Sequence, residues 1–125
     1  HPKTATLRRP MKEILTAIFE ILDAKKAINI RILDVSRIST FTNYFVICSG
    51  ANTKQIQILS DELLTKLGQQ GRKPAHMEGY QNAEWILMDY FDFIVHIFSL
   101  EARDFYELEK LWADGKVVDV RSYAQ

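Results

Sequence analysis

The spacing of apolar residues divides the chain into helical and extended segments. Between residues 11 and 27 they recur every three or four positions with Lys and Glu between them, which predicts an amphipathic helix packed on a sheet. Residues 53–71 repeat this spacing and predict a second helix, capped by Asn52 or Thr53 and ended by Gly71. The side chains expected to be buried along the second helix are Ile56, Leu59, Leu63 and Leu67.

Other segments have the pattern of strands. Residues 28–35 alternate apolar and polar side chains over most of their length, which predicts a strand. Residues 44–48 form a continuous apolar run, which is typical of a strand buried on both faces. A shorter strand is expected within residues 72–79, where Pro74 restricts it to the edge of a sheet.

The most apolar stretch of the chain predicts a β-hairpin with strands at 85–90 and 93–98. A two-residue turn at Phe91 and Asp92 joins the strands. Antiparallel pairing across this turn sets Trp85 opposite Phe98, Leu87 opposite His96, and Asp89 opposite Ile94. Because side chains alternate along a strand, these six residues share one face of the sheet.

The two faces of this hairpin differ in polarity. One face suits a core and carries Ile86, Met88, Tyr90, Phe93, Val95 and Ile97. The other face mixes aromatic residues with Asp89 and His96, a combination that protein-binding patches and clefts use. Neither polar residue can be buried cheaply without a partner. We therefore expect that the chain itself leaves this second face uncovered, with Trp85 available to another molecule.

A third helix is expected directly after the hairpin, with Ser99 as its cap. The apolar side of this helix presents Phe105, Leu108 and Leu111. The charged side chains of the opposite, solvated side are Arg103, Asp104, Glu107 and Lys110. The residues that follow are expected to form a short strand or an arm.

The order of these elements predicts an α/β fold in a single domain, with one mixed sheet of about five strands and helices packed on it. We assign residues 11–113 to this domain. Residues 1–10 are interpreted as a disordered lead-in or tag remnant, and residues 114–125 as a C-terminal tail.

Composition and charge restrict the possible functions. Of the 125 residues, 47% are hydrophobic and 26% are charged, as in an ordinary globular protein. Sixteen basic residues balance sixteen acidic ones, which disfavours a protein that wraps nucleic acid electrostatically. The single cysteine, Cys48, cannot form an internal disulfide, which fits a reducing compartment. No apolar run approaches the ~18 residues that a membrane-spanning helix needs.

Two groups of residues invite a catalytic interpretation, and neither is a complete site. The Ser49–Thr53 turn joins a buried strand to a helix and offers backbone N–H groups to an anion. The chain contains neither GxxxxGK[ST] nor GxGxxG, and no carboxylate pair for two metal ions follows that helix. His76, Glu78 and His96 lack the close spacing of zinc ligands, and no nucleophile accompanies His96.

We therefore expect no catalytic residue, no metal and no cofactor. The alternative is a small nucleotidyl- or phosphotransferase that uses the Ser49–Thr53 turn.

The segments NYFVICSGANTKQ and WILMDYFDFIVHIFSLEARDFYELEKLW, with an EG pair between them, resemble the ribosomal silencing factor family, also called the RsfS or Iojap family. The resemblance covers residues 11–113 and implies a nucleotidyltransferase-like fold without the catalytic carboxylates. This agrees with the missing metal pair. The positions that match the family are Trp85, Asp89, His96, Glu101, Arg103, Tyr106, Leu111 and Trp112.

The resemblance implies a regulator rather than an enzyme. Such a protein binds the large ribosomal subunit through ribosomal protein number fourteen, on the face where the small subunit docks. By occupying that face it blocks subunit joining and lowers translation when nutrients are short. The residues to which we carry the partner-binding role are Trp85, Asp89, Tyr90 and His96, followed by Arg103 and Tyr106.

The same resemblance places the protein in the cytoplasm of a bacterium, or less expectedly in an organelle matrix, with little or no direct contact to nucleic acid. A homodimer in which a second copy covers the hairpin face is an open alternative.

Three positions depart from the family pattern. Phe91 stands where the family usually has Gly, which tolerates a positive φ that Phe resists. It either changes the turn and the register or adds apolar surface at the hairpin tip. Ala83 stands where many members have Gly, and Asn43 where most have Asp.

Overall fold

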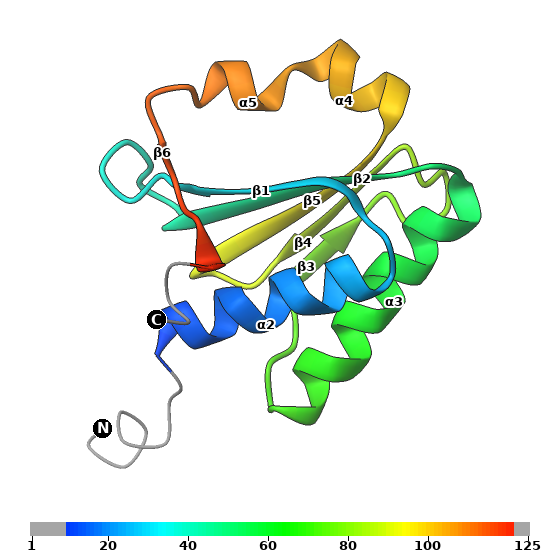
Figure 1. Ribbon diagram of the computed structural model, residues 1–125, viewed down its shortest axis with the longest axis horizontal. Coiled ribbons are helices and arrows are strands. Elements are labelled where there is room, and N and C mark those ends of the chain that lie inside the picture. The colour runs from blue at the N-terminus through cyan, green and yellow to red at the C-terminus, as the bar shows by residue number, and fades with distance from the viewer. Residues whose placement is uncertain (1–9, 122–125) are drawn as a thin grey trace.

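The computed structural model describes residues 10–121, in which one sheet lies between two layers of helices (Figure 1). The elements are α2 Met11–Ala24, β1 Ile28–Asp34, β2 Tyr44–Gly50, α3 Thr53–Gln69, β3 His76–Glu78, β4 Trp85–Asp89, β5 Phe93–Ser99, α4 Leu100–Tyr106, α5 Leu108–Leu111 and β6 Lys116–Val117. The lead-in expected for residues 1–10 lies, apart from Pro10, outside the described residues, as do residues 122–125 of the expected tail.

Within the described residues the strands form a single mixed sheet in the order β3-β4-β5-β2-β1-β6. The two central strands β2 and β5 run parallel, and the other neighbours pair antiparallel. The predicted α/β fold with one mixed sheet is therefore confirmed. The sheet has a sixth strand because β6, from the segment assigned to a tail, pairs with β1. The short strand β3 lies at the opposite edge, as predicted.

Helices α2 and α3 cover one face of the sheet and form the main hydrophobic core with it (Figure 1). The four residues predicted for the stripe on α3 are all buried there. Asn52 caps α3, because its side chain accepts a hydrogen bond from the backbone N–H of Gln55 at 2.8 Å. Gly71 follows the end of this helix with a φ of +81°, a conformation that favours Gly.

The hairpin formed by β4 and β5 has the predicted register. Trp85 pairs with Phe98, Leu87 with His96, and Asp89 with Ile94. The six side chains predicted for the core face all belong to the main core. Phe91 takes a φ of +71° at the turn and is 71% exposed, so it keeps the register and adds apolar surface at the hairpin tip.

Helices α4 and α5 cover the other face of the sheet and enclose a second, smaller core (Figure 1). Ser99 caps α4 as predicted, since its hydroxyl accepts the backbone N–H of Ala102 at 3.0 Å. The single continuous helix that we expected is wrong, because Glu107 takes a left-handed conformation with a φ of +48° between α4 and α5. This break changes which side chains face the sheet.

The predicted apolar side of that helix is therefore wrong at two of three positions. Leu108 packs against the second core, whereas Phe105 and Leu111 are 78% and 76% exposed. The side chains that face inward instead include Ala102 of α4 and Trp112, which directly follows α5.

Candidate protein-binding surface

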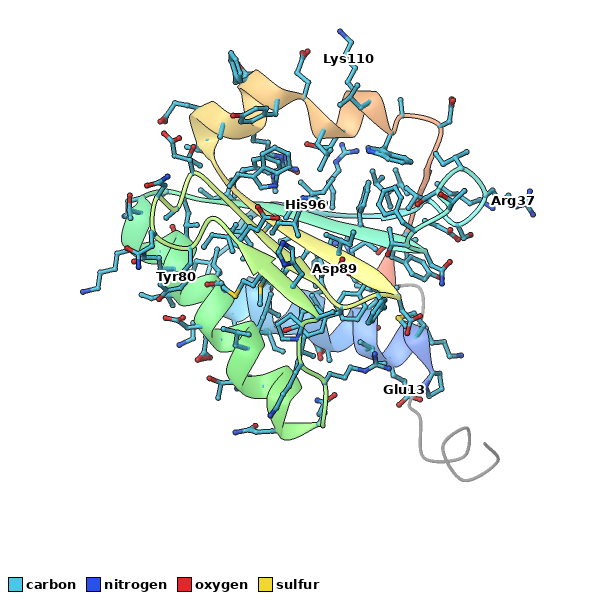
Figure 2. The ribbon with its side chains drawn as sticks, turned by 180° about the vertical axis from the view of Figure 1, so that it is seen from behind. Glu13, Arg37, Tyr80, Asp89, His96 and Lys110 are labelled. Carbon is cyan, nitrogen blue, oxygen red and sulfur yellow. The ribbon has the colours of Figure 1, made fainter. Side chains whose placement is uncertain are left out.

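The polar and aromatic face of the hairpin is covered over β5 and accessible over β4. Ile94, His96 and Phe98 of β5 are buried, with His96 only 3% exposed, because α4 and α5 pass over the centre of the sheet. The expectation that the chain leaves this whole face uncovered is therefore wrong for β5. Figure 2 shows His96 beneath the upper helix layer.

The layer formed by α4 and α5 covers β4 less completely than β5. Trp85, Leu87 and Asp89 remain half-buried and alternate with the fully buried Ile86 and Met88, which point into the main core. We expected the whole hairpin face to be accessible to another molecule, and β4 is the part of it that is.

The edge strand β3 widens the accessible part of this face. His76 pairs with Asp89, and Glu78 pairs with Leu87, so both exposed β3 side chains lie on the same face as these β4 residues. Nε2 of His76 and Oε2 of Glu78 lie 2.5 Å apart. We call the group Trp85, Leu87, Asp89, His76, Glu78 and Tyr106 the β3–β4 surface.

Trp85 is the largest side chain of the β3–β4 surface and is held by three neighbours. Its indole N–H donates a hydrogen bond to Nδ1 of His96 at 3.0 Å. Its ring packs against Phe98 and against Tyr106 of α4, with 4.9 Å between the ring centroids in both pairs. Since Tyr106 is 48% exposed, the two aromatic rings together form an anchored apolar patch at the surface.

Asp89 contributes to the turn as well as to the surface. One oxygen of its carboxylate accepts the backbone N–H of Phe91 at 2.9 Å, which supports the left-handed conformation of that residue. Figure 2 shows Asp89 on β4 of the sheet. The side chain therefore has a structural task that does not depend on a partner.

Tyr90 lies on the opposite face from Trp85. It is buried in the main core, where its ring stacks on Phe93 at a centroid distance of 4.9 Å. Burial raises the pKa of Tyr90 to about 12, so the phenol stays neutral. The structure therefore does not bring Tyr90 to the β3–β4 surface.

Arg103 is turned inward, which contradicts the expected solvated position. Its Nε donates to Oε1 of Glu109 at 2.8 Å, and its Nη1 donates to Oγ of Ser49 at 3.2 Å and to the backbone oxygen of Ile28 at 3.3 Å. The guanidinium thus links α4 and α5 to β1 and β2. We describe it as the Arg103 clamp.

A hollow of about 470 Å³ lies next to Tyr106. Its lining is acidic and aromatic and consists of Glu84, Glu101, Ala102, Asp104, Phe105 and Tyr106. The sequence patterns did not indicate this hollow, nor His76 and Glu78 as accessible neighbours of Trp85. The pairing of β3 with β4 places His76 beside Asp89 and Glu78 beside Leu87, and no sequence pattern specifies that pairing.

The Ser49–Thr53 turn is occupied by the chain's own side chains. Asn52 accepts the N–H of Gln55, and the side-chain oxygen of Gln55 accepts the N–H of Ala51 at 2.7 Å. A Cβ at Gly50 would lie 2.7 Å from the side chain of Ile56, so strand and helix are in close contact here. The turn thus works as a helix cap, in which the backbone N–H groups of Ala51 and Gln55 are both already hydrogen-bonded.

The remaining candidates for chemistry lack the necessary surroundings. Cys48 is buried in β2, and burial raises the pKa of its thiol to about 12, so it is not a ready nucleophile. Across residues 10–121 no three His, Cys, Asp or Glu side chains gather in a way that could hold a metal ion. No helix in that range is long and apolar enough to cross a membrane.

The fold and the surface together define a small single-domain α/β protein with an open mixed sheet and an accessible aromatic strip at one edge. The sequence model of the family described as "Ribosomal silencing factor during starvation" matches residues 8–125, and the chain belongs to this family. The family membership expected from the sequence is confirmed.

Individual proteins agree with this assignment. The chain is 38% identical to "Ribosomal silencing factor RsfS" of Bacillus subtilis over 109 residues, which cover 87% of this chain and 92% of that protein. It is 29% identical over 98 residues to the mouse "Mitochondrial assembly of ribosomal large subunit protein 1", which covers 76% of this chain and 43% of that protein. A crystal structure of a Chromobacterium violaceum protein superposes with a TM-score of 0.81 at 28% identity, covering 84% of this chain and 88% of the other.

Proposed function

We propose that this protein binds the large ribosomal subunit through ribosomal protein number fourteen and blocks the joining of the small subunit. In this way it represses translation when nutrients are limiting. It acts as a steric obstacle and carries out no catalysis. We place it in the cytoplasm of a bacterial cell, with little or no direct contact to ribosomal RNA.

Family membership supports the ribosome as the target. The family description names ribosomal silencing during starvation, and the mouse relative is named for assembly of the large ribosomal subunit. The zero net charge of the chain favours a protein contact over a contact with the phosphate backbone. A ribosomal protein on the large subunit satisfies both conditions.

The single observation that carries the proposed docking site is the β3–β4 surface. Trp85 and Tyr106 form an aromatic anchor that is rigid on its inner side and accessible on its outer side. Anchors of this kind, ringed by polar groups, dominate the binding energy of protein interfaces. Asp89, His76 and Glu78 provide such a polar ring on the neighbouring strand positions.

Large-subunit binding tests this proposal directly. Purified protein is co-sedimented with separate large subunits, separate small subunits and joined ribosomes, and the bound fraction is measured in each. We expect binding to the large subunit alone, and we expect added protein to reduce the yield of joined ribosomes. Protein that sediments equally with small subunits or with neither would contradict the proposal.

Trp85→Ala tests the docking surface. We expect this variant to weaken large-subunit binding by at least about 1–2 kcal/mol, because a central aromatic anchor is lost. Ile58→Ala, which removes an exposed apolar residue from α3 in the opposite helix layer, is the matched control and should bind normally. Thermal melts of both variants show whether the fold is retained. Tyr106→Ala removes the more exposed half of the anchor if Trp85→Ala does not fold.

The homodimer alternative predicts a different result. Sedimentation velocity without ribosomes would show a dimer that Trp85→Ala converts to monomer. A monomer at all concentrations would exclude a second copy as the partner of this surface.

A further inference from the structure

His96 is a buried polar residue whose main polar contact is with the docking anchor. It is 3% exposed and therefore cannot contact a docking partner directly. Its Nδ1 accepts the indole N–H of Trp85 at 3.0 Å. Among the described residues, no hydrogen-bond partner is found for its other ring nitrogen, Nε2.

The imidazole is itself fixed by aromatic neighbours. Phe45 meets it edge to face at a centroid distance of 4.9 Å and an interplanar angle of 88°. Phe98 lies nearly parallel to it at 6.2 Å. These contacts come from β2 and β5 in the centre of the sheet, so the acceptor atom Nδ1 has a defined position relative to the whole fold.

The hydrogen bond fixes which edge of the indole of Trp85 faces His96. Trp85 is half-buried on β4, and its outer side faces solvent. The contacts with Phe98 and Tyr106 are apolar ring contacts with interplanar angles of 31° and 48°, and they contain no directional hydrogen bond. The N–H to Nδ1 bond selects one edge of the indole, because only the Nε1 edge of the ring carries a donor.

We propose that His96 is a positioning residue: it orients the indole of Trp85 for docking to the large subunit and does not touch the partner. This inference rests on the proposed function. A side chain that is already ordered before binding does not lose its rotational freedom when the complex forms. Removing the acceptor should therefore weaken binding by roughly three- to tenfold without removing any interfacial atom.

Two substitutions separate positioning from packing. His96→Leu removes the acceptor but suits the aromatic surroundings, so the fold should be kept or become more stable. His96→Asn keeps an oxygen acceptor close to the Nδ1 position but buries a polar amide, so it should be less stable than His96→Leu. If His96 positions the indole, the more stable Leu variant binds the large subunit weakly, and the less stable Asn variant binds nearly as the natural protein does.

The indole N–H signal in the NMR spectrum reports the positioning step without ribosomes. Trp85→Phe identifies this signal, since Trp112 is the only other source of an indole N–H. We expect His96→Leu to shift the Trp85 signal and to accelerate its exchange with solvent, and His96→Asn to restore slow exchange.

A double-mutant cycle decides whether His96 acts through Trp85. In a Trp85→Phe background, His96→Leu should leave large-subunit affinity unchanged, because Phe has no donor to orient. Equal weakening in both backgrounds would overturn the inference, and so would unchanged affinity of His96→Leu in the natural background. If the natural protein itself does not bind large subunits, the proposed function fails first and the docking role of His96 fails with it.

Discussion

Two of the non-glycine residues with a positive φ stand at positions where glycine would be free of strain. Phe91 has a φ of +71° and Ala83 a φ of +53°, and the family resemblance places Gly at both positions. The surrounding contacts keep the Phe91 turn in place, since Thr42 donates its hydroxyl hydrogen to the Phe91 backbone oxygen at 2.9 Å. Asp89 accepts the N–H of the same residue. The chain thus retains the turn at a cost in backbone strain.

The substitution Phe91→Gly should relieve that strain. We expect the free energy of unfolding to rise by about 0.5–1 kcal/mol. Gly removes the cost of holding a residue with a Cβ in the left-handed conformation, but part of this gain is lost because Gly has more conformational entropy in the unfolded chain. Little burial is lost because the ring is mostly exposed. Urea denaturation measures the change, and Phe91→Ala, which keeps a Cβ at the same φ, should show no comparable gain.

The buried His96 should make stability depend on pH. Burial lowers the pKa of His96 to about 3, far below its value of about 6.5 in an unfolded chain. Between these values the unfolded chain binds a proton that the folded protein does not, so stability is full above about pH 6.5 and falls as the pH decreases toward 3.

We expect the free energy of unfolding to be about 2 kcal/mol lower at pH 5.0 than at pH 7.5 on account of this residue. Urea denaturation at the two pH values checks this. His96→Leu has no such group and should lose that part of the pH dependence. A variant that keeps the full difference would show that other residues cause it.

At the scale of elements, the position of α4 and α5 decides the character of the molecule's second face. The left-handed residue Glu107 separates the two helices, and the Arg103 clamp ties them to the centre of the sheet. Glu109 also lies 3.6 Å from Arg31 of β1. These contacts cover β5 and leave β4 at the rim of the helix layer.

Arg103→Met should loosen this layer. The substitution removes three hydrogen bonds and leaves Glu109 and Ser49 without the guanidinium, so we expect a loss of about 2 kcal/mol of stability. Lys110→Met, which removes an exposed cation from α5, is the control and should change stability by less than about 0.5 kcal/mol. Urea denaturation measures both.

Hydrogen exchange separates the clamp from general destabilisation. Arg103→Met should accelerate exchange in α4 and α5 more than in α2 and α3. Uniform acceleration across the four helices would contradict the role that we assign to Arg103.

At the scale of the whole molecule, the segment after residue 113 completes the fold. Strand β6 pairs with β1 at Leu33 and Asp34, and Val120 is buried in the main core at 4% exposure. This C-terminal segment therefore links the edge of the sheet to the layer of α2 and α3 (Figure 1).

Val120→Ala tests whether this segment contributes to stability. We expect a loss of about 1–2 kcal/mol in the free energy of unfolding, since two buried methyl groups are removed. Val117→Ala in β6 is the control, because Val117 is 61% exposed and should change stability by less than about 0.5 kcal/mol. Equal effects of the two substitutions would show that Val120 is not held in the core.

The features that the sequence predicted correctly are those that depend on residues close together in the chain. The stripe on α3, the cap at Ser99 and the pairing of Trp85 with Phe98 all follow from helical spacing, cap chemistry or strand alternation. Each depends on neighbours close along the chain, whose geometry is nearly the same in every protein. The α/β class follows from the order of these elements.

The tertiary structure alone decided which residues of the candidate surface are accessible. The exposure of His96, Phe105 and Arg103 depends on where α4 and α5 lie, and this follows from the backbone at Glu107 and from the contacts of Arg103. Those contacts join residues 54 and 75 positions apart in the chain. Local periodicity carries no information about pairs at such separation. The sequence by itself therefore determined the family and all the elements up to the end of the hairpin, and only the packing of the last two helices determined which part of the hairpin face is accessible.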